Sequence, residues 1–417
     1  MDAVVWEKLY SSASRPETIP VLTGFNANID RVIPVTPKLL AALCLQNGPG
    51  FAELKRRLLH SMKYSVADEM VICRPRIYHA ISRFFARRGK PVPGGQAGIA
   101  AARLQIRGFG PVTCAVPGAG KRTRALLERS GVTPCTFGEG PVRDPDPIHF
   151  VLEHSPGLVP PAPGTVPRSN RLIVSPAHKP SSIFIPAAAQ DAFLAQIAFC
   201  RRAFLSGYQY LHTEDEFSRA ARQLAQIRAL HPAMRTHIEC TGGIHPRIYA
   251  LIARHVFPHA DSIGLNEQEL GIAIRALAVR ETTRPDNSPV HPVALVRGAV
   301  TLACATGISR LHLHTFGYYI LIQKPGTGQP RASRDALFLA AREAADAAGG
   351  DRRVISPDGL AAYTAIRRAF GPDRPKGIFR TGDRTVIVVP ACISLPAKRT
   401  TGLGDIISST AFVTDPF

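Results

Sequence analysis

The feature that most constrains the fold is an alternation of short apolar runs with longer amphipathic stretches along most of the chain. The short runs are rich in β-branched residues and predict strands, whereas the stretches between them have the apolar period of helices. Strands and helices alternating at this spacing form βαβ units, whose mostly parallel sheet is covered by helices on both faces. The sequence therefore predicts an α/β fold, with one main domain over residues 1–417.

The predicted strands are Ile19–Gly24, Val112–Val116, His149–His154, Arg171–Val174, Tyr208–His212, Thr236–Glu239, Ser262–Gly264, Arg310–His314 and Arg384–Val389. The predicted helices are Phe217–Leu230, Glu267–Ala278, Ser333–Ala347 and Pro357–Phe370.

Two regions break this rhythm. Residues 31–92 are basic and have helical patterns but few signals of buried strands, and residues 155–168 (SPGLVPPAPGTVPR) are rich in Pro and Gly. Such a Pro/Gly-rich run predicts a loop or an excursion from the sheet. We expect both regions to belong to a small lid that leaves the main sheet and returns to it, over approximately residues 31–92 and 142–172.

The net charge of +20 needs an explanation, since 51 Lys and Arg stand against 31 Asp and Glu. Such an excess suits a nucleic-acid-binding protein. The basic residues are spread along the chain, however, and the densest cluster, Arg83–Lys90, holds only four. No nucleic-acid-binding motif accompanies them, so nucleic acid is not the expected partner. A positive cleft would also attract phosphorylated small molecules.

Other features favour a cytoplasmic protein without a membrane partner. The N-terminal segment MDAVVWEKLY lacks the apolar core of a signal peptide, and the longest apolar stretch, 293–308, is interrupted by Arg297. The eight cysteines are scattered and form no CxxC pair, which indicates free thiols rather than a zinc site or a disulfide framework.

The strongest chemical motif lies near the end of the sequence, where a predicted strand leads to TTGLGDIISSTAFV (400–413). Two glycines followed by an acid and an apolar helix start predict a loop whose backbone N–H groups bind an anion at a helix N-terminus. A carboxylate at Asp405 is consistent with that role if it accepts a proton from an attacking hydroxyl, as phosphoryl transfer requires. The structural alternative is that Asp405 merely caps the helix.

Three further motifs accompany this one. GGQAGI (94–99) is a glycine turn that allows close backbone approach to a ligand, or close helix–sheet packing. GFNANID (24–30) ends a strand with polar groups suited to sugar hydroxyls, or forms an Asx-rich turn. In IGLNEQEL (263–270), Asn266 and Glu269 stand three residues apart at a helix start, where they hold magnesium-bound water or form a capping box.

Together these motifs resemble those of the ADP-dependent sugar kinases (ADP-dependent glucokinase and phosphofructokinase) of the ribokinase-like superfamily. HIEC (237–240) and HLHTFGYY (312–319) also match, and the matches run in the family's order from residue 23 to residue 412. The resemblance implies a ribokinase-like three-layer α/β/α sandwich with a small, reduced lid. It also implies transfer of the β-phosphoryl group of ADP to a sugar, giving AMP, with Mg²⁺ as cofactor.

The resemblance assigns roles to individual residues. Asp405 is the expected general base, and the amides from Gly402 through Leu403 and Gly404 to Asp405 form the expected anion hole. The remaining expectations divide into three groups. The sugar-binding residues are Asn26, Asp30, Glu69, Gly94, Gly95 and Gln96. The nucleotide-side residues are Asn266, His314 and Arg171, and the magnesium-organising residues are Glu239 and Glu269. His237 is expected to be structural.

The sequence does not decide whether the phosphoryl acceptor is glucose or fructose 6-phosphate. The segment YSVADEM (64–70) lies where the family distinguishes glucose from fructose 6-phosphate, and Asp68 and Glu69 do not decide between them. Arg168 and Arg171 suit a sugar phosphate and favour fructose 6-phosphate. Two alternatives stay open: an ATP-dependent sugar or nucleoside kinase of the same fold, and a basic nucleic-acid-binding protein. A Rossmann oxidoreductase is disfavoured because the turn at Gly94 lacks the GxGxxG spacing.

Overall fold

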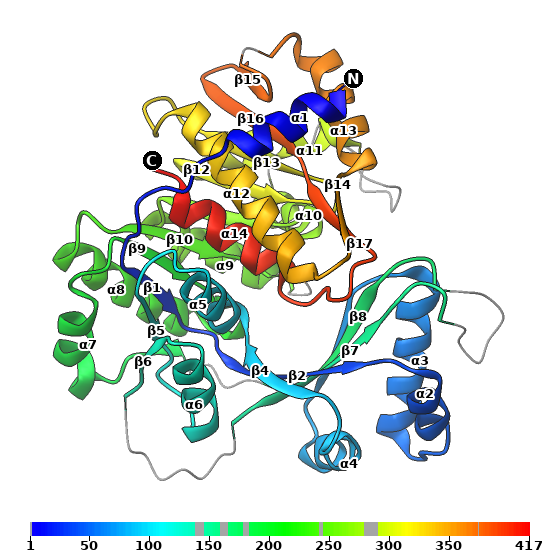
Figure 1. The fold of residues 1–417 in the computed structure, drawn as a ribbon. Helices are drawn as coiled ribbons and strands as arrows, with labels where there is room; N and C mark the ends of the chain where they lie inside the picture. Colours follow the sequence, from blue (N-terminus) through cyan, green and yellow to red (C-terminus); the bar gives the residue numbers. More distant parts are fainter. Residues whose placement is uncertain are drawn as a thin grey trace.

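The computed structural model describes residues 2–137, 146–158, 166–177, 183–241, 245–278, 291–373 and 375–417. Its main element is a ten-stranded sheet that runs through the larger part of the molecule (Figure 1). In spatial order its strands are β15 (Ile378–Thr381), β16 (Arg384–Pro390), β13 (Tyr318–Gln323), β12 (Arg310–His314), β11 (Ser262–Leu265), β10 (Arg235–Glu239), β9 (Arg202–Leu205), β1 (Val21–Gly24), β5 (Val112–Ala115) and β6 (Thr133–Cys135).

Seven of these strands, from β12 to β6, are parallel, and β13, β16 and β15 extend the sheet in antiparallel pairing. The central strands are buried on both faces, as parallel strands covered by helices should be. The predicted α/β class is therefore confirmed.

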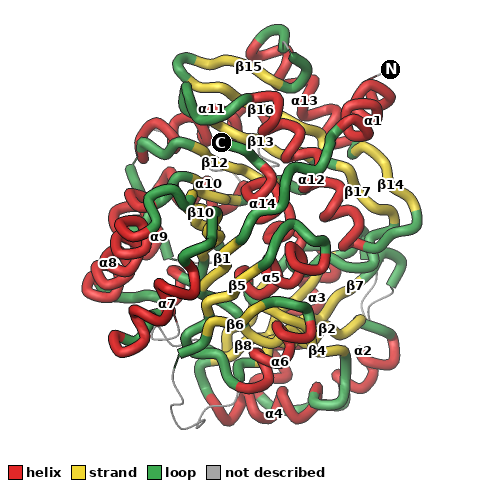
Figure 2. Tube along the Cα trace, turned by 60° about the vertical axis from the view of Figure 1, so that its left-hand side comes forward, coloured by secondary structure: helices red, strands yellow, loops and turns green. Residues whose placement is uncertain are grey.

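Helices cover both faces of this sheet, as Figures 1 and 2 show from two sides. One face carries α1 (Asp2–Ser12), α5 (Gln96–Ile106), α6 (Lys121–Arg129), α12 (Pro330–Ala348) and α14 (Leu403–Thr414). The other carries α7 (Gln190–Ile197), α8 (Glu214–Leu230), α9 (Pro246–His255), α10 (Glu267–Ala276), α11 (Pro292–Thr306) and α13 (Pro357–Phe370). Short 3₁₀ turns lie at Ala187–Ala189, Tyr208–Tyr210 and Phe257–His259, and β14 (Arg352–Ile355) pairs with β17 (Cys392–Leu395).

A second, five-stranded sheet lies beside the carboxyl end of the main one (Figure 1). Its spatial order is β3 (Asp68–Ile72), β8 (Asn170–Pro176), β7 (Ile148–His154), β2 (Asn28–Pro34) and β4 (Lys90–Gly94). Its helices are α2 (Pro37–Cys44), α3 (Pro49–Tyr64) and α4 (Pro75–Phe85). These elements bury an apolar core of their own, which includes Leu54, Phe85 and Leu172. We call this unit the small domain.

Two sequence-based expectations about strands were wrong. Residues 208–212 are not a strand: the strand is β9, and Gly207 then turns into the left-handed region with φ 103°, so Tyr208–Tyr210 forms a 3₁₀ turn. Residues 31–92 contain parts of β2 and β4 and all of β3, although few strand signals were seen there. Each of these strands has exposed or half-exposed positions, so none has the continuous apolar sequence that is typical of a buried strand.

The proline-rich stretch lies only partly within the described chain. Val166 makes two backbone hydrogen bonds across it: its carbonyl accepts from Gly157 N at 3.2 Å, and its amide donates to Leu158 O at 3.2 Å. Residues 159–165, like 142–145 of the second predicted excursion, are outside the described residues. All eight cysteines are free thiols, as expected. No helix in the described ranges is both long and apolar enough to cross a membrane.

Candidate active site

The candidate active site lies where the parallel strands of the main sheet end and the small domain begins. β1 runs through residues 25–27 into β2, so one segment links the two sheets. β10 ends at Glu239, β12 ends at His314, and α14 begins beside them. The carboxyl ends of parallel strands are where open α/β sheets bind ligands.

The GLGD segment forms the N-terminus of α14. Gly402 is the N-cap residue with φ 73°, a left-handed conformation, and a Cβ there would lie 2.8 Å from Ile99. No side chain among the described residues caps this end, and the first amides of a helix have no intrahelical acceptor. These N–H groups, at Gly402, Leu403 and Gly404, can therefore bind an anion together with the helix dipole.

Asp405 lies half-buried in the first turn of this helix. Burial raises the pKa of its carboxyl to about 7, Arg171 opposes that rise, and the negative charge of Asp30 adds to it. A carboxyl with a pKa near neutrality can accept a proton at physiological pH. Asp30 comes from β2 of the small domain, so charges from both domains act on the Asp405 carboxyl.

The sugar-side motifs meet at the junction of β2 and β4. Asn28 Nδ2 donates to Asp30 Oδ1 at 2.8 Å, and burial raises the pKa of Asp30 to about 6. The glycine turn is required by close packing: a Cβ on Gly94 would lie 2.1 Å from Asp30 Oδ1, and one on Gly95 would lie 2.6 Å from Asn26 O. Asn28 Oδ1 is buried without a hydrogen-bond partner within the described chain.

Gln96 connects this turn to the main sheet. Its Nε2 donates to Cys240 O at 2.8 Å, and its Oε1 accepts from Gln209 Nε2 at 3.3 Å. Gln96 thus holds the turn against the loop after β10, with its amide already engaged in these two bonds.

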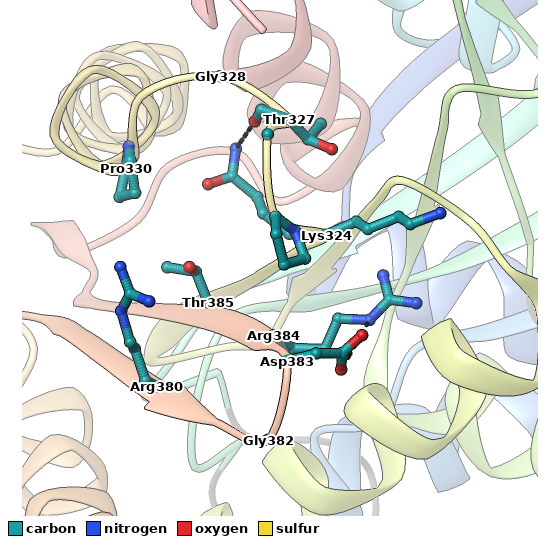
Figure 3. Close-up of a pocket in the computed structure, with 12 residues that line it drawn as sticks. Lys324, Thr327, Gly328, Pro330, Arg380, Gly382, Asp383, Arg384 and Thr385 are labelled. Atoms are coloured by element: carbon teal, nitrogen blue, oxygen red, sulfur yellow. Dashed lines mark hydrogen bonds and ion pairs between the residues drawn. The ribbon is translucent and has the colours of Figure 1, made fainter.

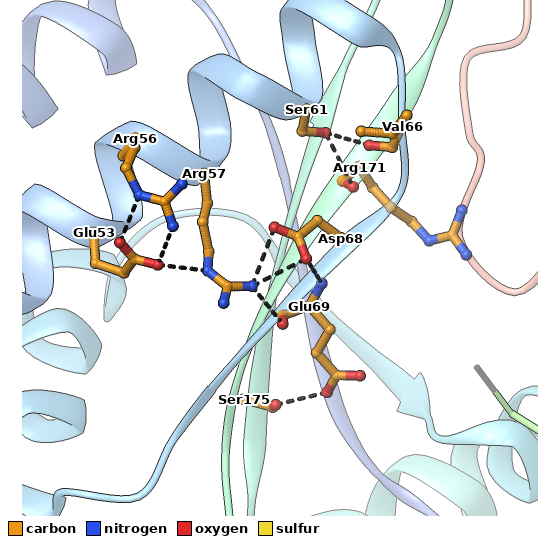
Figure 4. A network of polar contacts seen from close by, with 9 residues as sticks. All are labelled: Glu53, Arg56, Arg57, Ser61, Val66, Asp68, Glu69, Arg171 and Ser175. Atoms are coloured by element: carbon orange, nitrogen blue, oxygen red, sulfur yellow. Dashed lines mark hydrogen bonds and ion pairs between the residues drawn. The ribbon is translucent and has the colours of Figure 1, made fainter. Parts of the chain in front are cut away.

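The acidic pair of the YSVADEM segment divides between two faces of β3 (Figure 4). Asp68 pairs with Arg57 of α3 at 3.0 Å, within a network that also includes Glu53. Glu69 instead accepts from Ser175 Oγ at 2.6 Å and raises the pKa of Asp30 through its charge. Of the two acids, only Glu69 therefore faces the site.

Arg171 points from β8 toward the C-terminal segment, away from α3 (Figure 4). Its Nη1 donates to Thr400 O at 3.2 Å, and its Nε is buried without a hydrogen-bond partner among the described residues. Burial lowers its pKa, while Asp405, Glu153, Asp30 and Glu69 oppose that change through their charges. Arg171 is thus the cation around which the acids of both domains gather.

Glu239 is buried at the end of β10. Its Oε2 accepts from Ser408 Oγ at 2.5 Å and contacts His237 Nε2 at 3.0 Å. Burial, followed by the charge of Asp405, holds the pKa of Glu239 well above its usual range, and the charge of Glu269 adds to the effect. His237 itself is buried, stacked on Phe204, so it is a core residue that also orients Glu239.

Asn266 and Glu269 form the capping box that was the structural alternative for this motif. Asn266 Oδ1 accepts from the amides of Gln268 and Glu269, and Glu269 Oε2 accepts from Asn266 N at 2.7 Å. Asn266 Nδ2 also donates to Glu269 Oε1 at 2.7 Å. The box starts α10 directly behind the site, and its carboxylate remains close enough to Glu239 to influence that group's pKa.

The two histidines of β12 have different environments. His314 lies against the glycine turn, because a Cβ on Gly404 would be 3.0 Å from its Nε2, and the same nitrogen is 3.9 Å from Glu239 Oε1. Burial lowers the pKa of His314 to about 4, so it is neutral at pH 7. His312 is fully buried, and neither ring nitrogen has a hydrogen-bond partner in the described part of the chain.

Sequence reasoning missed three residues that the fold brings to the site. Glu153 of β7 contacts the segment just before Gly402, Ser408 binds Glu239, and the charge of Arg399 lowers the pKa of Asp30. Only Ser408 had a local signal, since it lies three residues after Asp405 and hence one helical turn further on the same face. The other two are positioned by contacts between distant segments.

A separate hollow lies at the opposite end of the main sheet (Figure 3). This cavity of about 300 Å³ is enclosed by the turn around Gly326 and Gly328, the start of α12 and the β15–β16 turn, with Arg380 on its wall. In the β12–β13 pair, Gln323 of this region lies opposite Arg310, whereas His314 lies opposite Tyr319. The cavity is therefore remote from Asp405 and is not the candidate active site.

The three-layer fold, with an uncapped glycine-rich helix start and a carboxyl of near-neutral pKa at the carboxyl edge of its sheet, defines a ribokinase-like phosphotransferase. The model of the ADP-specific phosphofructokinase/glucokinase conserved region matches residues 19–414, so the chain belongs to that family. The resemblance inferred from the motifs is thereby confirmed, as is the expectation of an ADP-dependent sugar kinase.

Relatives of both kinds span the whole chain. The chain is 26% identical to an ADP-dependent glucose/glucosamine kinase of Pyrococcus furiosus, over 98% of each chain. It is also 26% identical to an ADP-specific phosphofructokinase of Methanosarcina acetivorans, over 99% of this chain and 97% of the relative. Among solved structures, an ADP-dependent kinase complex with fructose 6-phosphate and ADPβS aligns with a TM-score of 0.82 at 24% identity, covering 99% and 98% of the two chains. That likeness shows the shared fold.

Proposed function

We propose that the protein transfers the β-phosphoryl group of ADP to the primary hydroxyl of a hexose or hexose phosphate, with AMP as the other product. The observation that carries this proposal is Asp405, a carboxyl of pKa about 7 in the uncapped first turn of α14. At neutral pH such a group takes the proton of the attacking hydroxyl, while the amides of Gly402, Leu403 and Gly404 stabilise the charge on the transferring group.

The sugar lies in this proposal between the small domain and α14. Asn26, Asp30, Gly94, Gly95 and Gln96 come from the junction of the two sheets, and Glu69 enters from β3. Asn28 fixes Asp30, and the glycine turn allows the backbone to approach the sugar closely. We infer that the small domain, built from the two segments expected to form a lid, covers the bound sugar.

Fructose 6-phosphate is favoured over glucose because arginines surround this space. Arg171 Nε has no hydrogen-bond partner among the residues that the structure describes, and Arg399 acts on Asp30 through its charge. Arg168 lies over the exposed ring of Phe316 at 4.6 Å. A guanidinium group is suited to bidentate recognition of phosphate. The family contains enzymes named for both acceptors, so activity with glucose as well is compatible with membership.

Magnesium fits the acidic residues on the nucleotide side. Glu239 and Glu269 are both buried, and the pKa of Glu239 is raised by burial first, then by the charges of Asp405 and Glu269. A divalent cation would offset this penalty. Both already accept hydrogen bonds from protein groups, and the described residues contain no group of three or more ligands. This arrangement suits Mg²⁺ held largely through water. When bound, the ion neutralises charge on the phosphates of ADP.

The nucleotide is placed in this proposal beyond the GLGD turn, along the ends of β11 and β12. His314 is neutral and touches that turn, Asn266 begins the adjacent helix, and Arg171 completes the ring of polar groups around the phosphates. We retain cytoplasmic location as a prediction.

Replacement of the base tests the proposal. Asp405→Asn should lower kcat by about 10²- to 10⁴-fold, since it removes the proton acceptor but keeps the shape of the side chain. The dissociation constant of ADP, measured by calorimetry, should change by less than about 3-fold. Asp215→Asn, on the exposed start of α8, is the matched control and should retain full activity. Unchanged turnover in Asp405→Asn would remove Asp405 from the mechanism.

A further inference from the structure

Glu153 makes an unusual concentration of contacts with the segment before the GLGD turn. Its Oε1 accepts from Thr400 N at 2.8 Å and from Thr401 N at 2.9 Å. The same oxygen also accepts from the hydroxyls of Thr400 at 3.2 Å and Thr401 at 2.8 Å. A carboxylate of the small domain thus binds four donors from two consecutive residues of the catalytic segment.

Arg171 holds the same segment from the neighbouring strand. Glu153 and Arg171 are directly opposite each other in the antiparallel β7–β8 pair, so their side chains project from one face of the small sheet. Arg171 Nη1 donates to Thr400 O at 3.2 Å. Glu153 therefore binds the N–H groups of the segment and Arg171 binds one of its carbonyl groups. Together the two side chains fix the orientation of the peptide.

These contacts leave the anion hole free. Thr400 and Thr401 precede the N-cap Gly402, so Glu153 uses amides that lie outside the helix and does not engage those of Gly402, Leu403 and Gly404. Gly402 itself has little room to move, because a Cβ there would overlap Ile99. The position of the hole thus depends on Ile99 of the main domain and on Glu153 of the small domain.

We propose that Glu153 is a positioning residue that fixes the anion hole through Thr400 and Thr401 and so couples the placement of the small domain to phosphoryl transfer. The inference rests on the proposed function for its catalytic part only. The carboxylate does not touch the reacting atoms; it acts through the peptide that carries them. Its negative charge near the phosphate site is offset by Arg171, which it faces across the sheet.

Hydrogen–deuterium exchange of the ligand-free protein tests the hydrogen bonds from Thr400 and Thr401 to Glu153 independently of activity. Glu153→Ala removes the acceptor of two amides, so exchange at Thr400 and Thr401 should become at least about 10-fold faster. Glu153→Gln keeps a carbonyl oxygen at the same position and should restore most of the protection. Glu53→Ala, in an exposed network of α3, is the control and should leave these amides unchanged.

Steady-state kinetics test the coupling to the reaction. Glu153→Ala should lower kcat by roughly 10- to 100-fold, as expected for loss of charge-assisted bonds that orient the transition-state donors, with the KM for ADP changed less than about 3-fold. Glu153→Gln should lie within about 5-fold of the wild type, which also keeps the test valid if the alanine variant folds poorly. In Thr401→Val, which lacks one of the four donors, the Glu153→Ala change should have a smaller effect than in the wild type.

Each result has a single meaning. Unchanged exchange at Thr400 and Thr401 in Glu153→Ala would show that Glu153 does not hold these two residues, whatever the activity, and would overturn the proposal. Faster exchange with unchanged kcat would overturn the coupling and reduce Glu153 to a structural contact. Failure of the proposed function itself would appear as full activity in Asp405→Asn, a result that leaves the exchange measurement intact.

Discussion

Ser408 donates a hydrogen bond of 2.5 Å to Glu239 Oε2, and this bond joins the second turn of α14 to the end of β10. Asp405, the proposed base, stands one turn earlier on the same helix. Rotation or translation of α14 would therefore move the base, the anion hole and the magnesium-side carboxyl together. The Ser408 hydroxyl thus links the helix that carries the proposed base, Asp405, to the proposed magnesium-side carboxyl, Glu239.

Removal of that hydroxyl should weaken the response to magnesium. In Ser408→Ala, Glu239 loses the hydrogen bond that lowers its pKa, so its protonated form becomes more populated and its attraction for a cation falls. The Mg²⁺ concentration for half-maximal activity should rise by about 3- to 10-fold, while kcat at saturating Mg²⁺ falls less. Thr414→Val removes a hydroxyl at the far end of α14 and should leave the Mg²⁺ titration unchanged. An unaltered titration in Ser408→Ala would contradict the role of Glu239.

The pKa of Asp405 predicts the pH dependence of turnover. The base acts in its ionised form, so kcat/KM for the sugar should rise about tenfold per pH unit on the acid side and level off above pH about 7. Asp30, with a pKa of about 6, interacts with Asp405. The rise of kcat/KM on the acid side of the profile therefore reports the titration of the two carboxyls as a pair, not of Asp405 alone. Initial rates between pH 5 and 9 would measure it. A flat profile between pH 5.5 and 8 would contradict the assignment.

The same raised pKa predicts that the base destabilises the fold. Its pKa lies above the unfolded value of 3.8, so the folded state binds the proton more tightly. Stability is therefore lost as the pH rises from about 4 through 7, and the loss is complete above that range. Asp405→Asn should raise the free energy of unfolding at pH 8 by roughly 1 to 3 kcal/mol, with the gain vanishing near pH 4.

Denaturant titrations at the two pH values would measure this gain. Asp215→Asn, which replaces an exposed acid, should show no such pH-dependent difference. Equal stability of wild type and Asp405→Asn at pH 8 would show that burial of the carboxyl costs little.

The glycine turn should be intolerant of a methyl group for two separable reasons. Gly95 has φ 70° and ψ 154°, a conformation reached almost only by glycine that costs another residue about 1–3 kcal/mol, and a Cβ there would also lie 2.6 Å from Asn26 O. Gly95→Ala should therefore raise the KM for the sugar at least about 10-fold. Gly349→Ala has a similar φ of 67° with no atom closer than 4.0 Å, so it should show the strain without the effect on KM. Equal effects of the two variants on KM would contradict the sugar-side role of the turn.

The sequence predicted those parts of the molecule that depend on local pattern. Buried strands such as Arg310–His314 and amphipathic helices such as Pro357–Phe370 have continuous signals, so the α/β class and most of the large sheet could be anticipated. In the small domain, β7 and β8 were anticipated as residues 149–154 and 171–174. β2, β3 and β4 were not, because each is partly exposed and lacks a uniform apolar or alternating pattern. Tyr208–His212 was misread because its apolar and aromatic residues follow a left-handed glycine rather than continuing a strand.

The same distinction holds for the candidate site: residues in short local motifs could be predicted, whereas residues brought together by the fold could not. Asp405 and the glycine turns could be proposed as site residues from the sequence because each lies in a motif of a few consecutive residues. Glu153 was not, since its importance arises from residues 247 and 248 positions away, Thr400 and Thr401, and nothing in LEHSPG indicates that contact. Arg171 was recognised, but the acids that surround it come from strands of both sheets and from α14, an arrangement that only the fold reveals.

The central claim is that the donor is ADP and the product is AMP. The most direct measurement is therefore a matrix of ADP and ATP, as donors, against fructose 6-phosphate and glucose, as acceptors, with the nucleotide products separated by chromatography. We predict AMP formed in equal amount to the sugar phosphate from ADP, dependent on Mg²⁺ and most rapid with fructose 6-phosphate. ADP formed from ATP, with no AMP from ADP for either acceptor, would contradict the account.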